Sequence, residues 1–73
     1  MTIALRQVTV TVNGEDKSFP APITIDELLA EMGLRRELVA VELNRNLVRR
    51  AQFGEQGIAE GDRLEIVEFV GGG

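Results

Sequence analysis

The segment that decides the fold is TIDELLAEMGL, residues 24–34, because its signals for a helix agree from beginning to end. Thr24 and Glu27 form a capping box, in which the Thr24 side chain serves the amide of Glu27 and Glu27 reaches back. Gly33 stands where a left-handed residue would end the helix, and Leu34 can make the accompanying hydrophobic contact. We therefore predict one amphipathic helix whose apolar stripe lies in the core, formed by Ile25, Leu28, Leu29 and Met32.

Two strands and a hairpin turn are predicted before the helix. Valine and threonine alternate over residues 8–12, which is typical of a half-buried strand. Asn13-Gly14 follows and favours a hairpin turn, because both residues tolerate positive φ. A second short strand is predicted over residues 17–19, and Pro20 suits an edge position at its end. The apolar residues before position 8 have the opposite parity, so residues 1–7 either contain a bulge or lie outside the main strand.

Three more strands are predicted after the helix, over residues 38–43, 47–48 and 63–70. Residues 51–59 contain two glycines and no sustained period, which indicates a loop or a single helical turn. The adjacent pair Arg49-Arg50 is either a solvated pair or a contact for a phosphate or an acidic partner.

This order of elements predicts a single α+β domain over residues 1–73. One amphipathic helix can cover only one face of a mixed four- to five-stranded sheet, so helix and sheet form two layers. The simplest arrangement places the first and last strands side by side and parallel at the centre of the sheet. That arrangement is the β-grasp, or ubiquitin-like, layout.

The composition excludes several classes of function. The 73 residues include no cysteine and no histidine, so a disulfide, a zinc cluster and the commonest general base are all missing. Twelve acidic and eight basic residues give a net charge of -4, which argues against nucleic-acid binding and suits docking on a basic patch of another protein. No apolar run is long enough to span a membrane, and we expect an intracellular protein without an enzymatic activity of its own.

The last strand carries apolar residues on both faces. Leu64 and Ile66 share one face, while Val67 and Phe69 lie on the other, directly before the end of the chain. If Leu64 and Ile66 point at the helix, Val67 and Phe69 form an apolar docking patch on the open face. The alternative is a bulge near Val67 that turns one of them inward, and the sequence leaves both open.

The chain ends in Val70-Gly71-Gly72-Gly73. A glycine run is costly to order, so we expect this tail to be flexible. Fully extended, its three glycines reach roughly 10 Å, far enough to carry the carboxylate of Gly73 into a channel too narrow for a side chain. The plainer interpretation is a frayed end or a linker.

Five segments in this order and spacing resemble the ThiS sulfur carriers of thiamine biosynthesis. The resemblance covers the chain from about residue 8 to residue 73, although no single segment is specific. The chain departs from the family pattern in two places. It has the additional residues 1–7, and it has arginine within Val48-Arg49-Arg50, where the family often has proline. The segments are VNGE at 12–15, TIDELL at 24–29, VAVELN at 39–44, GDRLEIV at 61–67 and VGGG at 70–73.

The resemblance implies a β-grasp fold and a carrier function in the cytoplasm. A ThiF-like, E1-type enzyme would adenylate the carboxylate of Gly73 with ATP, and cysteine-derived sulfur from a desulfurase would convert it to a thiocarboxylate. Thiazole synthase would then take the sulfur. Val70, Gly71 and Gly72 would enter the partner's active site, and no catalytic residue, metal or bound cofactor is expected in the chain itself.

Three other functions stay open at this point. A MoaD-like carrier for molybdopterin synthesis would use the same fold and tail chemistry with another acceptor. A ubiquitin-like interaction module would bind a partner through its sheet and would not need its terminal glycines. A small RNA-binding β-grasp domain is disfavoured by the acidic charge and by the lack of tyrosine and tryptophan.

Overall fold

The structure is a computed structural model that describes residues 6–70. It contains one α-helix, five strands and two short 3-10 turns in this part of the chain. In chain order the elements are β1 (Gln7–Val12), β2 (Glu15–Pro20), α1 (Ile25–Glu31), η1 (Arg36–Leu38), β3 (Val39–Leu43), β4 (Asn46–Val48), η2 (Arg50–Gln52) and β5 (Arg63–Glu68).

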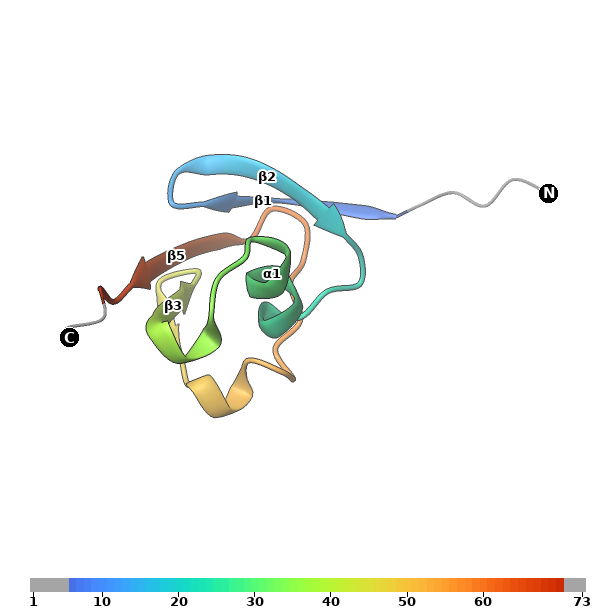
Figure 1. The fold of residues 1–73 in the computed structure, drawn as a ribbon. Coiled ribbons are helices and arrows are strands. Elements are labelled where there is room, and N and C mark those ends of the chain that lie inside the picture. Colours follow the sequence, from blue (N-terminus) through green and yellow to red (C-terminus); the bar gives the residue numbers. More distant parts are fainter. Residues whose placement is uncertain (1–5, 71–73) are drawn as a thin grey trace.

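The five strands form one mixed sheet in the order β2-β1-β5-β3-β4. β1 and β5 are parallel neighbours at its centre, and the other neighbouring pairs are antiparallel. Helix α1 covers one face of the sheet, as Figure 1 shows. The prediction of an α+β fold in two layers, with the first and last strands parallel and adjacent, is confirmed.

Helix α1 begins and ends as its sequence predicts. The Glu27 amide donates to the Thr24 hydroxyl at 3.2 Å, and the Thr24 amide donates to the Glu27 carboxylate at 2.9 Å, which completes the capping box. Gly33 has a φ of 73°, and the amides of Gly33 and Leu34 donate to carbonyls of the last turn. Ile25, Leu28 and Leu29 are buried, whereas the fourth residue of the predicted stripe, Met32, is only partly buried at the end of the helix.

Two tight turns use residues with positive φ. Asn13 and Gly14, with φ of 51° and 84°, connect β1 to β2, as predicted. The Asn13 side chain also bonds to β5, the other neighbour of β1 in the sheet. Its amide donates to the Ile66 carbonyl at 3.1 Å, and its oxygen accepts from the Ile66 amide at 2.7 Å. Asn13 thereby continues the pairing of β1 with β5 beyond Val12, where the strand itself turns away.

The core lies between α1 and the sheet, and it includes one residue from the segment predicted as a loop. Phe53 is 1% exposed and follows η2, so residues 51–59 supply a large core side chain in addition to a turn. An isolated aromatic residue in a segment with two glycines has no period, and the sequence pattern could not reveal its burial. The other buried residues come from regular elements and their flanks: Val8, Val10, Val12, Phe19, Ile23, Ile25, Leu28, Leu29, Val39, Val41, Leu43, Leu64 and Ile66.

Several strand boundaries differ from those predicted. β2 is twice as long as expected because all six of its residues pair with β1, and Pro20 is its last residue on the outer edge of the sheet. β3 begins at Val39 because Leu38 belongs to η1. β5 ends at Glu68, two residues earlier than predicted, because its partner β3 begins at Val39, which pairs with Glu68. β1 begins at Gln7, and residues 1–5 lie outside the described part of the chain.

Candidate functional site

The candidate site is the end of β5, where the central strand of the sheet leaves the body of the domain. Leu64 and Ile66 face the core and are 1% and 7% exposed. The last backbone bond that ties the chain to the sheet runs from the Phe69 amide to the Leu38 carbonyl, at 2.7 Å. Val70 follows with 93% of its surface exposed. The remaining predicted tail residues, Gly71, Gly72 and Gly73, lie outside the described residues.

Val67 and Phe69 are exposed on the open face of the sheet. Their exposed fractions are 58% and 51%, so the alternative in which a bulge turns one of them inward is wrong. Ala40 pairs with Val67 across β3 and β5, and Leu47, 70% exposed, lies on the neighbouring strand β4. We call Ala40, Leu47, Val67 and Phe69 the open-face patch. Exposed apolar surface of this kind marks an interaction site more often than isolated surface residues do.

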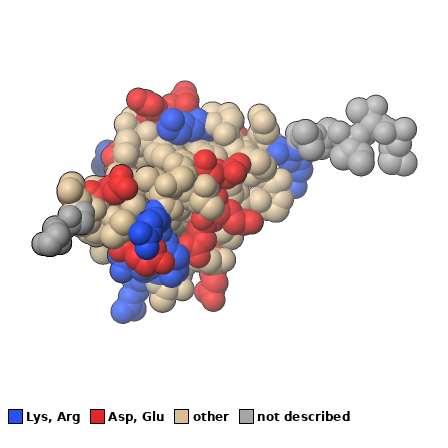
Figure 2. Space-filling view, viewed as in Figure 1, with Lys and Arg blue, Asp and Glu red and all other residues tan. Residues whose placement is uncertain are grey.

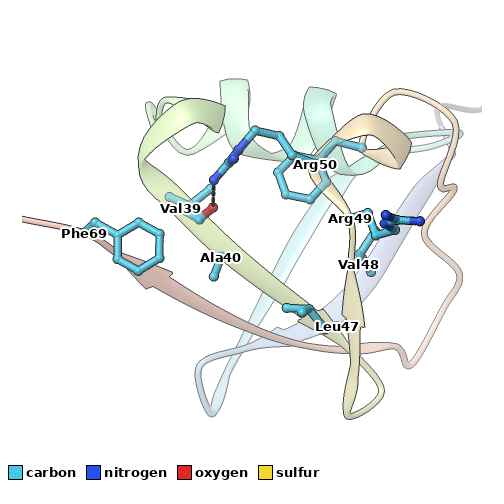
Figure 3. Close-up of a pocket in the computed structure, with 8 residues that line it drawn as sticks. Val39, Ala40, Leu47, Val48, Arg49, Arg50 and Phe69 are labelled. Carbon is cyan, nitrogen blue, oxygen red and sulfur yellow. Dashed lines mark hydrogen bonds between the residues drawn. The ribbon is translucent and has the colours of Figure 1, made fainter.

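A shallow pocket of about 210 Å³ opens beside this patch, where β4 separates from β3. Figure 3 shows Phe69 and Leu47 on either side of Ala40, with Arg49 and Arg50 on the segment above β4. The buried ring of Phe53 contributes to the lining. The pocket therefore combines an apolar floor with two cationic side chains at its rim.

The two arginines at this rim differ in their contacts. The Arg50 guanidinium donates to the carbonyls of Arg36 and Val39, at 2.9 and 3.2 Å. Arg49 makes no side-chain hydrogen bond or ion pair with any residue between positions 6 and 70. Both arginines are exposed, as the prediction of a solvated pair has it, but the Arg50 guanidinium is also bound to two carbonyls of the chain, which the sequence did not reveal.

Charge on the rest of the open face is mixed. Glu42 and Glu65 are directly opposite each other on β3 and β5, between the patch and the far end of the sheet. Acidic and basic side chains alternate on the side of the molecule shown in Figure 2, and no continuous basic surface is visible there. Such a surface does not have the positive stripe typical of nucleic-acid binding.

The described residues offer little for chemistry of their own. Within residues 6–70, no three or more carboxylate side chains come together in a group that could hold a metal ion. The same part of the chain has no helix long and apolar enough to cross a membrane. The described part of the site consists of an apolar surface and the exposed residue Val70.

Sequence reasoning did not place Ala40, Leu47 or Phe53 in the site, and it did not reveal the bonds of Asn13 to β5. Leu47 could have been placed on the open face from its neighbours. Alternation along the strand puts Leu47 and Val48 on opposite faces, and Leu47 pairs with Glu42 on β3. The bonds from Asn13 to Ile66 cross 53 positions of sequence, and the turn signal at Asn13-Gly14 says nothing about them.

Comparison with known proteins identifies the family. The sequence model of the ThiS family matches residues 5–73. The sulfur carrier protein ThiS of Bacillus subtilis is 36% identical over 63 residues, which are 85% of this chain and 96% of that protein. The crystal structure of the thiamine biosynthesis protein ThiS from Geobacter metallireducens superposes with a TM-score of 0.76 at 32% identity, over 90% of this chain and 100% of that one.

A second kind of relative is much longer than this chain. A thiazole synthase of Paramagnetospirillum magneticum is 41% identical over 64 residues, which are 88% of this chain. The chain spans only 20% of the length of that protein, so the likeness concerns one segment of it. Together with the matches along the whole length of ThiS proteins, these findings show that the chain belongs to the ThiS family of sulfur carrier proteins.

Proposed function

We propose that the carboxylate of Gly73 is the group that receives sulfur, and that the folded body delivers it to partner enzymes. The observation that carries this proposal is the family match, which runs through Gly73. The geometry supports it, because only Phe69 and Val70 separate the glycine run from β5, a strand paired on both edges, and Val70 is already 93% exposed.

The chemistry requires activation by another protein. A carboxylate is a poor acyl donor at neutral pH, so we infer that a ThiF-like, E1-type enzyme activates it with ATP. An oxygen of the Gly73 carboxylate attacks the α-phosphorus of ATP, and pyrophosphate leaves. The terminal sulfur of a persulfide, formed from cysteine on a desulfurase, then attacks the acyl carbon, and AMP leaves. A thiol reduces the resulting acyl disulfide by two electrons and is itself oxidised to a disulfide. The product is a thiocarboxylate on Gly73.

Glycine suits this reaction for a steric reason. The activating enzyme must enclose the acyl carbon to exclude water and to align the attack. A Cβ on residue 72 or 73 would widen the tail at the point where the enclosure is tightest. The chain needs no catalytic residue or bound cofactor of its own, because the partner enzymes supply ATP and sulfur. Both are available in the cytoplasm, where we place the protein.

The open-face patch would dock these partners. Val67 and Phe69 directly precede the tail, so an enzyme that binds the patch holds the reacting end close to its own active site. Thiazole synthase is the proposed sulfur acceptor. In two proteins named thiazole synthase, a segment similar to this chain accounts for 20% of the polypeptide, which supports a pairing of the two activities.

The test is intact-protein mass spectrometry after incubation with ATP, a cysteine-fed desulfurase and the cognate ThiF-like enzyme. We expect one oxygen to be replaced by sulfur in the full-length chain. A variant without Gly72 and Gly73 is the matched control and should gain no sulfur. An unmodified full-length chain, under conditions where the enzyme forms acyl adenylate on a known ThiS protein, would contradict the proposal.

The acceptor is tested separately with the purified thiocarboxylate. Thiazole synthase should consume it, whereas the large subunit of a molybdopterin synthase should not. Transfer to the molybdopterin enzyme alone would favour the MoaD-like function. If the chain without its last two glycines still supports thiazole formation, the protein acts as an interaction module.

A further inference from the structure

Two arginines, Arg36 and Arg50, bond to each other's backbone. The Arg36 guanidinium donates to the Arg50 carbonyl at 2.8 Å, and the Arg50 guanidinium donates to the Arg36 carbonyl at 2.9 Å. We call these two residues the arginine clasp. It joins η1 to η2, which are separated by β3 and β4 in the sequence.

The clasp is also attached to the helix and the core. Arg36 forms an ion pair with Asp26 in the first turn of α1, at 2.9 Å, and its guanidinium lies 5.8 Å from the centre of the Phe53 ring. Arg36 therefore has a fixed position relative to α1. The fork of an arginine can bond several acceptors at once, which the single ammonium of a lysine cannot do in the same geometry.

A second set of bonds connects the clasp to the base of the tail. Arg50 also donates to the Val39 carbonyl at 3.2 Å, the bond drawn as a dashed line in Figure 3. The residue before Val39 is Leu38, whose carbonyl accepts the Phe69 amide at 2.7 Å. The Arg50 side chain thus fixes the backbone of residues 36–39. The Leu38 carbonyl in this segment in turn accepts the bond from Phe69, the residue before Val70.

We propose that Arg36 and Arg50 are positioning residues for the carrier reaction, because they fix the direction in which the chain leaves the sheet at Phe69. This inference rests on the function proposed above. If residues 36–39 were free to move, the Leu38 carbonyl would not hold Phe69 in one place. A partner that binds the open-face patch would then have to order the base of the tail, at a cost in conformational entropy.

Arg49 provides the matched control. It is adjacent to Arg50, lines the same pocket and carries the same charge, but it points to the opposite side in Figure 3. Its side chain makes no hydrogen bond with any of residues 6–70, as described above. A variant at Arg49 removes a positive charge from the partner-facing rim without disturbing the clasp.

The experiment compares Arg50→Ala, Arg50→Lys and Arg49→Ala as substrates of the cognate ThiF-like enzyme in an ATP–pyrophosphate exchange assay. For both Arg50 variants we expect the KM for the carrier to rise roughly tenfold with a nearly unchanged kcat, because ordering of the tail is part of binding. Arg49→Ala leaves the clasp intact, so its Phe69 amide should stay protected, and any rise in its KM measures the loss of a positive charge at this rim. If Arg50→Lys raises the KM as much as Arg50→Ala does, the planar guanidinium is required and a positive charge alone is not sufficient.

Amide hydrogen exchange gives a readout that does not depend on the partner. In both Arg50 variants the Phe69 amide should lose protection, while the amides of Val41 and Ile66 in the paired strands should keep theirs. Unchanged protection at Phe69 together with an unchanged KM would overturn the inference. Should Arg50→Ala fail to fold, Arg36→Lys, which keeps a cation beside Asp26, takes its place with the same expected results.

The outcomes for the two proposals are distinguishable. If the parent protein is never adenylated but the Phe69 amide loses protection in the Arg50 variants, the clasp fixes the chain exit and the proposed function is wrong. If adenylation proceeds equally well in all variants despite a loss of protection at Phe69, the carrier function stands and the positioning role is overturned.

Discussion

The two faces of the sheet differ sharply in solvent exposure, although residues that point to one face or the other alternate along the same strands. On the covered face Val39 and Val41 are fully buried under α1. On the open face Leu47 and Val67 leave 70% and 58% of their surfaces exposed. Both faces carry apolar side chains at the end of the sheet where β5 leaves the domain. They differ because α1 covers one face and leaves the other open. Hydrophobic residues on the covered face stabilise the fold, whereas those on the open face form the docking surface that we propose.

The largest effect on stability is expected from a comparison of two phenylalanines, one in the core and one on the open face. Phe53→Ala should lower the free energy of unfolding by about 3–5 kcal/mol, because it removes a fully buried ring and leaves a cavity. Phe69→Ala should change it by less than about 1 kcal/mol, since half of that ring is already exposed. Urea denaturation followed by circular dichroism measures both.

The milder Phe53→Leu variant serves if Phe53→Ala is unfolded without denaturant. Its expected cost is about 1.5 kcal/mol or less. Equal destabilisation by the Phe53 and Phe69 substitutions would mean that the two faces do not divide stability and recognition in this way.

The next prediction tests recognition on the open face. Phe69→Glu should lower kcat/KM for activation by the ThiF-like enzyme by at least about tenfold, which is about 1.4 kcal/mol, because a charge would have to be buried in the docked complex. The unfolding midpoint should be nearly unchanged. Gln7→Glu adds the same charge on β1, outside the patch, and should leave activation unaffected. Comparable losses for both variants would point to net charge and not to the patch.

An intermediate effect is expected at Asn13, which joins the first hairpin to β5. Asn13→Gly retains a residue suited to the φ of 51° but removes both bonds to the Ile66 backbone. We expect a loss of about 1–2 kcal/mol in unfolding free energy, because two partly buried backbone groups lose their partner. Exchange of the Ile66 amide by NMR checks the mechanism, and unchanged protection there would contradict it.

The smallest expected effect is a gain. Glu42 and Glu65 are directly opposite on the open face, and neither forms an ion pair within residues 6–70. Like charges in this register repel, so Glu65→Gln should raise the unfolding free energy by about 0.2–1 kcal/mol. The gain should shrink as salt is added, because exposed charges are screened. A gain that persists in high salt would have another origin than repulsion.

Much of the fold could be predicted because each of its local signals has a local cause. The capping box, the Gly33 end of α1 and the Asn13-Gly14 turn depend on a few neighbouring residues, and the structure has all three as predicted. The adjacency of β1 and β5 was predicted as the simplest arrangement of the strands, and the sheet order confirms it. Strand ends were less certain, since Glu68 ends β5 only because Val39 begins β3.

The site was only partly predictable. Alternation placed Val67 and Phe69 on the open face but could not decide between exposure and an inward bulge, since that depends on the whole sheet. The burial of Phe53 and the bonds of Arg50 to two carbonyls depend on contacts between distant segments. The roles of Gly71, Gly72 and Gly73 come from the family and stay predictions.

The central position of β5 has a mechanical consequence. A partner that draws the carboxyl end into a narrow channel pulls along the axis of this strand. Because β5 is bonded to β1 on one edge and to β3 on the other, the pull loads those bonds together, in shear. An outer strand under the same force would be held by the bonds of one edge alone. The molecule can thus be held under tension by its own terminus while its body stays folded.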